Sequence, residues 1–215
     1  MSSRLPFRSR VLTALGAALL VGVFIFPIWR IDLEAPQYPE GIGMLIHVNA
    51  VGGVKPNDLN NINGLNHYIG MKAIEPESIP ELTYMPWIVG TLLVSGLLVA
   101  LWGRRAALVG WVSLFMVVGV LGIVDFWLWG YDYGHNLDPQ AIIKIPDMVY
   151  QPPLIGSKQL LNFTAHSWPD IGGMMAAASF LLGAIALYLA YRKPAEPRPA
   201  RAAAAERALR PQVAG

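Results

Sequence analysis

The sequence predicts an all-α membrane protein, with four transmembrane helices and a small periplasmic cap formed by two loops. The first observation is composition: 54% of the 215 residues are hydrophobic and 14% are charged, whereas about 25% of the residues in a soluble domain are charged. The second is the presence of four long apolar segments. Each approaches the roughly 20 residues that a helix needs to cross about 30 Å of hydrocarbon.

The predicted spans are Val11–Trp29, Pro86–Trp102, Ala106–Trp129 and Gly172–Tyr191. Arg4, Arg8 and Arg10 precede the first span, as in a signal peptide. Its apolar core is longer than that of a usual signal peptide, and "FPIWRIDLE" follows it without a small-x-small cleavage site. We therefore expect an uncleaved anchor.

The distribution of Lys and Arg predicts the orientation. Eleven lie on the side of the spans that holds both termini and the "GRR" turn, and five lie on the other side. Because cytoplasmic segments carry the excess of basic residues, we expect the first side to be cytoplasmic in a bacterial inner membrane. The predicted organisation is 1–29 (N-terminus and first span), 30–85 (periplasmic loop A), 86–129 (spans two and three), 130–171 (periplasmic loop B), 172–191 (span four) and 192–215 (disordered cytoplasmic tail).

Loop A contains an unusual polar stretch, "DLNNINGLNHYIGM", at residues 58 to 71. A rotation of 100° per residue predicts an amphipathic helix over about 58–72. One stripe holds Leu59, Ile62, Leu65 and Ile69, and the opposite stripe holds Asn60, Asn63, His67 and Met71. We expect the apolar stripe to lie on the membrane surface or on loop B.

Two pairs of residues in loop A predict a copper site. His67 and Met71 stand at i and i+4 and point the same way on the predicted helix. Met44 and His47 form a second half-site, three residues apart in "MLIH". Imidazole and thioether groups together suit Cu(I). The alternative is that the polar stripe faces solvent or a partner protein, while the Met side chains pack.

Four other residues are candidate second-shell or alternative ligands. Asp125 lies inside the third span, where a carboxylate is costly and indicates a function; alternatively, it reaches water at the nearby interface. Asp132 and His135 follow it in "YDYGHNLDP". His166, in "NFTAHSWPDIGG", is interpreted as a ligand or as a hydrogen-bonding partner of a neighbouring loop.

Several classes of function are excluded. The chain has no Cys, which excludes disulfides, thiolate metal sites and c-type haem attachment. It has no phosphate-binding glycine loop, no H-E-x-x-H and no G-x-S-x-G. A net charge of +2 without a basic face argues against nucleic acid as a partner. We expect a protein that is not an enzyme and whose partners are the lipid bilayer and a periplasmic or membrane protein.

Three segments carry a resemblance: "NINGLNHYIGMK", "YDYGHNLDP" and "YQPPLIGSKQLLNF". Together they resemble a group of uncharacterised bacterial integral membrane proteins associated with gene neighbourhoods for nitrous-oxide reductase maturation and periplasmic copper delivery. The resemblance covers roughly residues 40–173. The resemblance implies an accessory role in denitrification, in the handling of copper, with His67 and Met71 as the first candidate functional residues.

The expected function is therefore periplasmic copper handling or metalloenzyme maturation by a membrane-anchored accessory protein, which binds Cu(I) or docks a copper carrier. The alternative is a structural or quinone-site subunit of an electron-transfer or oxidase complex, with the cap as a docking surface.

Overall fold

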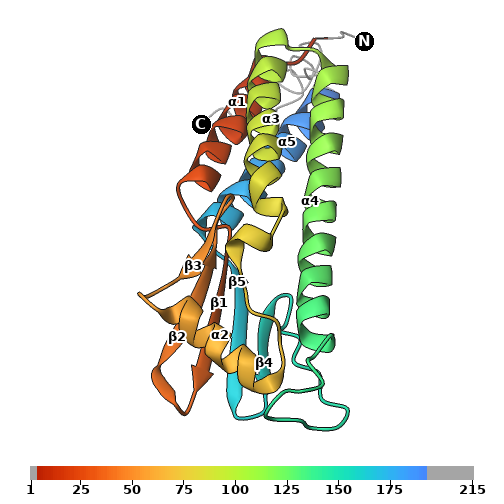
Figure 1. The fold of residues 1–215 in the computed structure, drawn as a ribbon. Coiled ribbons are helices and arrows are strands. Elements are labelled where there is room, and N and C mark those ends of the chain that lie inside the picture. Colours follow the sequence, from red (N-terminus) through yellow and green to blue (C-terminus); the bar gives the residue numbers. More distant parts are fainter. Residues whose placement is uncertain (1–3, 193–215) are drawn as a thin grey trace, which may run out of the picture.

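The computed structural model describes residues 4–192, and it is a mixed α/β structure. Four long helices form one end, and a five-stranded antiparallel sheet with a short helix across it forms the other (Figure 1). The predicted all-α class is wrong, because the two loops of the predicted cap pair as strands. We call the sheet, the short helix and their connections the cap.

The four predicted apolar spans all fall in long helices. These are α1 (Phe7–Leu19) with its 3₁₀ continuation η1 (Leu20–Phe24), α3 (Glu81–Trp102), α4 (Arg105–His135) and α5 (Ile171–Tyr191). Each is long and apolar enough to cross a membrane. The first ends earlier than predicted, at Phe24, because Trp29 already begins a strand. The predicted disordered tail lies outside the described residues, apart from Arg192.

The sheet joins the two loops into one unit. Its strands are β1 (Trp29–Ala35), β2 (Tyr38–Ile46), β3 (Val51–Gly53), β4 (Gly156–Leu160) and β5 (Phe163–Pro169), in the order β3-β2-β1-β5-β4. β1 of loop A pairs along its length with β5 of loop B. The segment "WRIDLEA" alternates apolar and charged residues, which is typical of a strand with one buried face.

The buried face of the sheet packs against α2 (Asp58–Ile69) and the end of α4. The members of this core include Trp29, Ile31, Ile42, Met44, Ile62, Ile74 and Tyr133. At about 1.5 Å per residue, the 31 residues of α4 extend about 46 Å. Because this exceeds the hydrocarbon thickness by about 16 Å, its last turns reach the cap.

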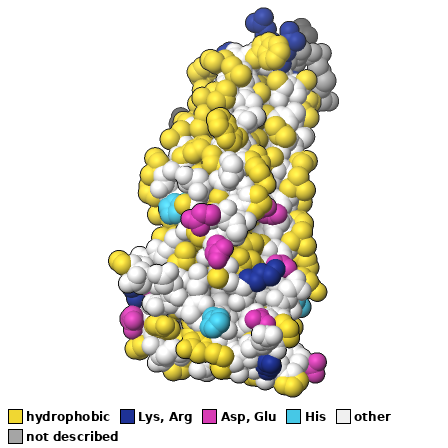
Figure 2. All heavy atoms as spheres, in the orientation of Figure 1, with side chains coloured by type: hydrophobic (Ala, Val, Ile, Leu, Met, Phe, Trp, Pro, Cys, Tyr) yellow, Lys and Arg dark blue, Asp and Glu magenta, His cyan; other side chains and the backbone are white. Residues whose placement is uncertain are grey.

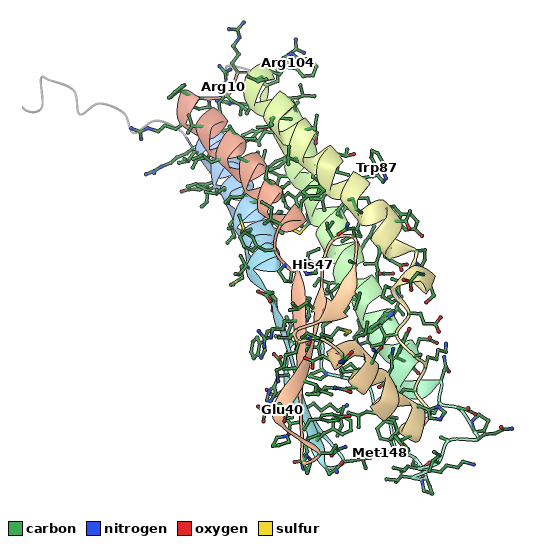
Figure 3. All side chains as sticks on the ribbon, turned by 60° about the vertical axis from the view of Figure 1, so that its left-hand side comes forward. Arg10, Glu40, His47, Trp87, Arg104 and Met148 are labelled. Atoms are coloured by element: carbon green, nitrogen blue, oxygen red, sulfur yellow. The ribbon has the colours of Figure 1, made fainter. Side chains whose placement is uncertain are left out.

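The two ends of the molecule differ in charge. Figure 3 places Arg10 and Arg104 at the end opposite the cap, and Glu40 and Met148 at the far tip of the cap. In Figure 2 most of the visible Asp and Glu side chains lie on the cap, whereas the helices present a hydrophobic surface. The Arg10 guanidinium donates to the carbonyl oxygens of Ala100 and Leu101 at 2.8 and 2.9 Å, and so closes the end of α3.

Candidate functional site

Met44 and His47 do not form a half-site in the way their spacing suggested. Side chains three residues apart meet on a helix, but they point to opposite faces of a strand and lie about 10 Å apart along it. Met44 belongs to β2, is 3% exposed and packs in the cap core. His47 follows the end of β2 at the junction of the cap with the helices (Figure 3).

His67 and Met71 also separate, because α2 ends before it reaches Met71. Gly70 takes the left-handed conformation (φ 80°) after the last helical residue, Ile69. His67 is exposed on α2, whereas Met71 is half-buried against the cap core. Met44 lies in the cap core, and Met71 packs against it.

The polar residues of α2 hold neighbouring segments. The buried Asp58 carboxylate accepts hydrogen bonds from the backbone N–H groups of Gly43 and Lys55, at 3.0 and 3.1 Å. Asn63 accepts from the Ile74 N–H at 2.7 Å and donates to the Ile74 carbonyl at 3.1 Å. This reciprocal pair mimics a strand pairing and fixes the chain that follows α2. The polar residues of α2 therefore stabilise the cap by holding β2, Lys55 and Ile74, and only part of the stretch faces solvent.

His166 lies on the outer face of the sheet. Its Nδ1 is 2.6 Å from Ser157 Oγ on β4, and its Nε2 is 3.7 Å from Glu34 Oε1 on β1. His166 therefore bonds to β4 through Nδ1 and lies beside β1 through Nε2. Beside it, Arg30 Nε donates to Asp32 at 2.7 Å, and this hydrogen bond raises the pKa of the guanidinium.

The residues at the cap end of α4 engage one another. Asp132 accepts from Lys72 Nζ at 2.7 Å and also bonds to Asn136, so it ties α4 to the segment after α2. The His135 ring stacks on Tyr131, with 3.8 Å between ring centroids, and its Nδ1 lies 2.9 Å from the Tyr131 carbonyl oxygen. None of these contacts of Asp132 and His135 is made with a predicted copper ligand.

Asp125 is a carboxylate within the long helix α4 that has no partner in the described part of the chain. It is exposed within the apolar part of α4, and the nearby carboxylate of Glu81 on α3 repels it. Among residues 4–192, no hydrogen bond or ion pair compensates either carboxylate. Sequence reasoning identified Asp125 from its position in the span, but nothing in the sequence pointed to Glu81 as its neighbour.

The packing seam of α4 is interrupted next to Asp125. Its members follow a spacing of four and three residues, as in a packed helix pair, and are Leu108, Val112, Phe115, Gly119, Gly122, Phe126, Trp129 and Tyr133. The seam is buried in the helix core near Phe115 and in the cap core at Tyr133. Between them, every residue from 119 to 125 is exposed. A Cβ placed on Gly119 or Gly122 would have nothing within 4 Å.

Figure 1 shows α4 standing apart from the other helices along this stretch. The gap lies within the apolar part of the helix, where a packed neighbour or lipid must cover it. We call residues 119–125 the open seam.

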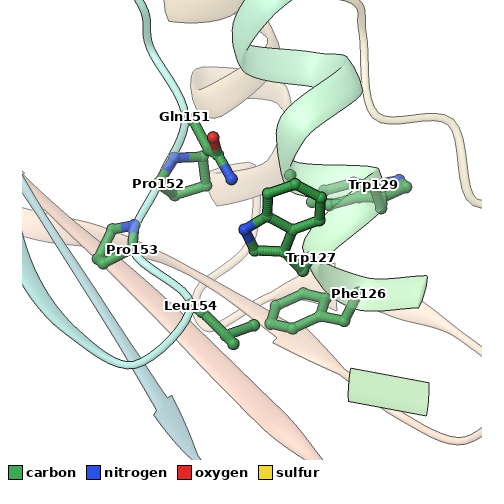
Figure 4. Close-up of a pocket in the computed structure, with 8 residues that line it drawn as sticks. Phe126, Trp127, Trp129, Gln151, Pro152, Pro153 and Leu154 are labelled. Carbon is green, nitrogen blue, oxygen red and sulfur yellow. The ribbon is translucent and has the colours of Figure 1, made fainter. Parts of the chain in front are cut away.

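Two surface hollows were considered as candidate ligand-binding sites. A shallow groove between α4 and residues 151–154 has a cavity volume of only ≈ 10 Å³ and is lined by Trp127, Phe126, Pro152 and Leu154 (Figure 4). It is smaller than the roughly 300–1,000 Å³ of small-molecule sites. A second hollow, at the β1–β2 turn, is lined by Glu34 and Glu40 and is broadly open to solvent. Within the described part of the chain, no three His, Cys, Asp or Glu side chains are grouped to hold a metal ion.

Sequence reasoning missed one exposed apolar surface at the tip of the cap. Tyr68 and three isoleucines of the loop after α4 expose between 43% and 67% of their area. The signal was present in "AIIKIPD", where apolar residues stand between turn-forming residues in a segment with no helical or strand period.

Comparison with known proteins does not identify the chain: no protein-family model, curated protein or solved structure matches it significantly.

Proposed function

We propose that this protein is an accessory subunit of a membrane protein complex, and that a transmembrane helix of its partner covers the open seam of α4. The observation that carries the proposal is the interrupted packing seam, buried at both ends and exposed throughout residues 119–125. Gly119 and Gly122 let a second backbone approach closely, which is how helices associate in a membrane without a hydrophobic driving force.

The charges next to the open seam support a protein partner over lipid. Asp125 lies about 6 Å along the helix from Trp129, hence near the membrane boundary. An uncompensated carboxylate at this depth is costly, and Glu81 adds a second negative charge. A basic residue on the partner helix would compensate both. Neutral lipid chains would cover the glycines but leave the carboxylates unpaired.

The proposed orientation places the cap in the periplasm and both chain ends in the cytoplasm. It is supported by the eleven basic residues on one side of the helices and the five on the other. In this orientation the complex has a membrane-embedded interface at α4 and a folded cap that is available to periplasmic proteins.

The narrower proposal is that the complex handles copper for a periplasmic metalloenzyme. It is supported by the resemblance of three segments of the chain. The proposed accessory role does not depend on copper binding by this chain.

The test is photocrosslinking in living cells of the native host. Full-length protein carries a benzophenone amino acid at Ile123, in the open seam. We expect a covalent adduct with a partner membrane protein, and Gly122→Leu should reduce its yield at least about tenfold because the new side chain fills the space of the partner backbone. Gly110→Leu is the matched control, since Gly110 is also an exposed glycine of α4 with nothing within 4 Å, outside the seam.

Adducts with lipid alone would overturn the proposal. Equal losses from Gly122→Leu and Gly110→Leu would also overturn it, because they would reflect a general effect on α4. Circular dichroism of both variants checks that the helices are retained.

A further inference from the structure

The tip of the cap carries an apolar surface that its own fold leaves uncovered. Its members, which we call the tip patch, are Tyr68, Ile142, Ile143 and Ile145, with exposed fractions of 52%, 67%, 43% and 43%. The loop that follows α4 lies at the end of the cap farthest from the helices (Figure 1). Lipid that surrounds the helices therefore does not account for the patch.

Hydrogen bonds hold the tip patch in place. The Ile143 N–H donates to the Tyr68 carbonyl at 2.9 Å, and the Asp138 N–H donates to the Gly70 carbonyl at 2.8 Å. Pro139 and Pro146 bracket the isoleucines and restrict their backbone. A surface fixed before binding loses little conformational entropy when a partner covers it.

A contiguous exposed apolar surface on a folded protein indicates an interaction site. The three isoleucines lie in one short loop, and the backbone bond between Ile143 and Tyr68 brings that loop beside the exposed tyrosine at the end of α2. Hydrophobic side chains reach the surface at this end of the cap in Figure 2, among charged ones.

The charge of the cap indicates the kind of partner. Segments 30–85 and 130–171 hold eleven carboxylates and five cationic side chains, a net charge of −6. Asp138 and Asp147 are exposed on either side of the isoleucines, Lys144 is exposed between them, and Asp132 pairs with Lys72. A surface of this sign accelerates association with basic proteins and disfavours acidic ones.

We propose that the tip patch docks a soluble protein whose contact surface has an apolar centre and a basic rim. The isoleucines supply the centre of the interface, and the carboxylates of the cap guide the partner to it. This inference is independent of the open seam, because the seam lies in the middle of α4, within its apolar part, whereas the tip patch lies beyond the end of α4 at the tip of the cap.

The test compares two exposed isoleucines of the cap in the full-length protein. A benzophenone amino acid is placed at Ile142 or, as the matched control, at Ile155, which is 55% exposed just before β4. We expect position 142 to give an adduct with a soluble protein of basic isoelectric point, identified by mass spectrometry, and position 155 not to give it.

The identified protein is then purified and titrated against the detergent-solubilised chain. Ile142→Ser should weaken binding about tenfold relative to Ile155→Ser, as loss of one buried aliphatic side chain predicts. Added salt should slow association for both variants. An acidic partner, a second copy of this chain, or equal losses from the two Ser variants would overturn the proposal.

Discussion

Asn63 offers the sharpest test of what the polar stretch of α2 does. It makes two hydrogen bonds with the backbone of Ile74, whose side chain is 5% exposed in the cap core. Each such bond contributes about 1 kcal/mol net, so Asn63→Ala should cost about 2 kcal/mol. That corresponds to an approximately 30-fold larger population of the locally open state of residues 72–79.

Hydrogen–deuterium exchange measured by mass spectrometry on the peptide covering residues 72–79 provides the assay, with the full chain in detergent or nanodiscs. Asn60→Ala is the matched control. Asn60 lies one turn earlier on α2, is exposed and makes no side-chain hydrogen bond with any described residue. Both substitutions gain the same helix propensity, so the difference between them isolates the hydrogen bonds of Asn63.

Two results would refute the reasoning. One is an increase in exchange of less than about threefold in Asn63→Ala, which would mean that the two bonds contribute little. The other is an equal increase in Asn60→Ala. Either result would favour the alternative that the polar residues of α2 only face solvent or a partner protein.

Three further predictions concern single positions. Gly134→Ala should destabilise the cap by about 1–3 kcal/mol, measured by thermal unfolding, because a Cβ there would overlap the backbone of Gln151. Gly110→Ala should keep or raise stability, because a Cβ there meets nothing within 4 Å and Ala favours the helix. Tyr150→Phe should keep or raise stability, because the buried hydroxyl has no partner among the described residues. Burial raises the pKa of Tyr150, so the parent should lose more stability than this variant as the pH rises above about 10. Met44→Leu should change stability by less than about 1.5 kcal/mol and leave Cu(I) content unchanged in a competition titration; loss of stoichiometric copper would instead identify Met44 as a ligand.

The membrane-spanning part of the fold could be predicted from the sequence. Long apolar runs, broken by Pro, Gly and charged residues, identify the four helices to within a few residues at most ends. α2 was also predicted, with its start at Asp58, because its apolar period is that of a helix. These are local properties, and each element is specified by its own residues.

The cap sheet was missed although β1 carries an alternating pattern. "WRIDLEA" reads apolar and charged in turn, but its partner β5 lies more than 120 residues later in the chain. The pairing depends on the helices returning the chain to the same side. An isolated alternating segment is a weak signal, since an unpaired strand is not stable by itself.

The copper prediction depended on the same missed element. Met44 and His47 would meet on a helix but diverge on a strand, and Gly70 ends α2 before Met71. Residue types that suit a metal are visible in a sequence, but their convergence depends on the element that carries them.

The amino-acid sequence was sufficient for the composition of the anchor, the predicted orientation and the residues that could carry chemistry. These follow from hydropathy, charge and local period, which neighbouring residues define. The sheet, the hydrogen bonds made by Asn63 and Asp58, the open seam beside Asp125 and the uncovered tip patch required the folded chain. Each depends on contacts, or on missing contacts, between residues far apart in sequence, and no local pattern contains that information.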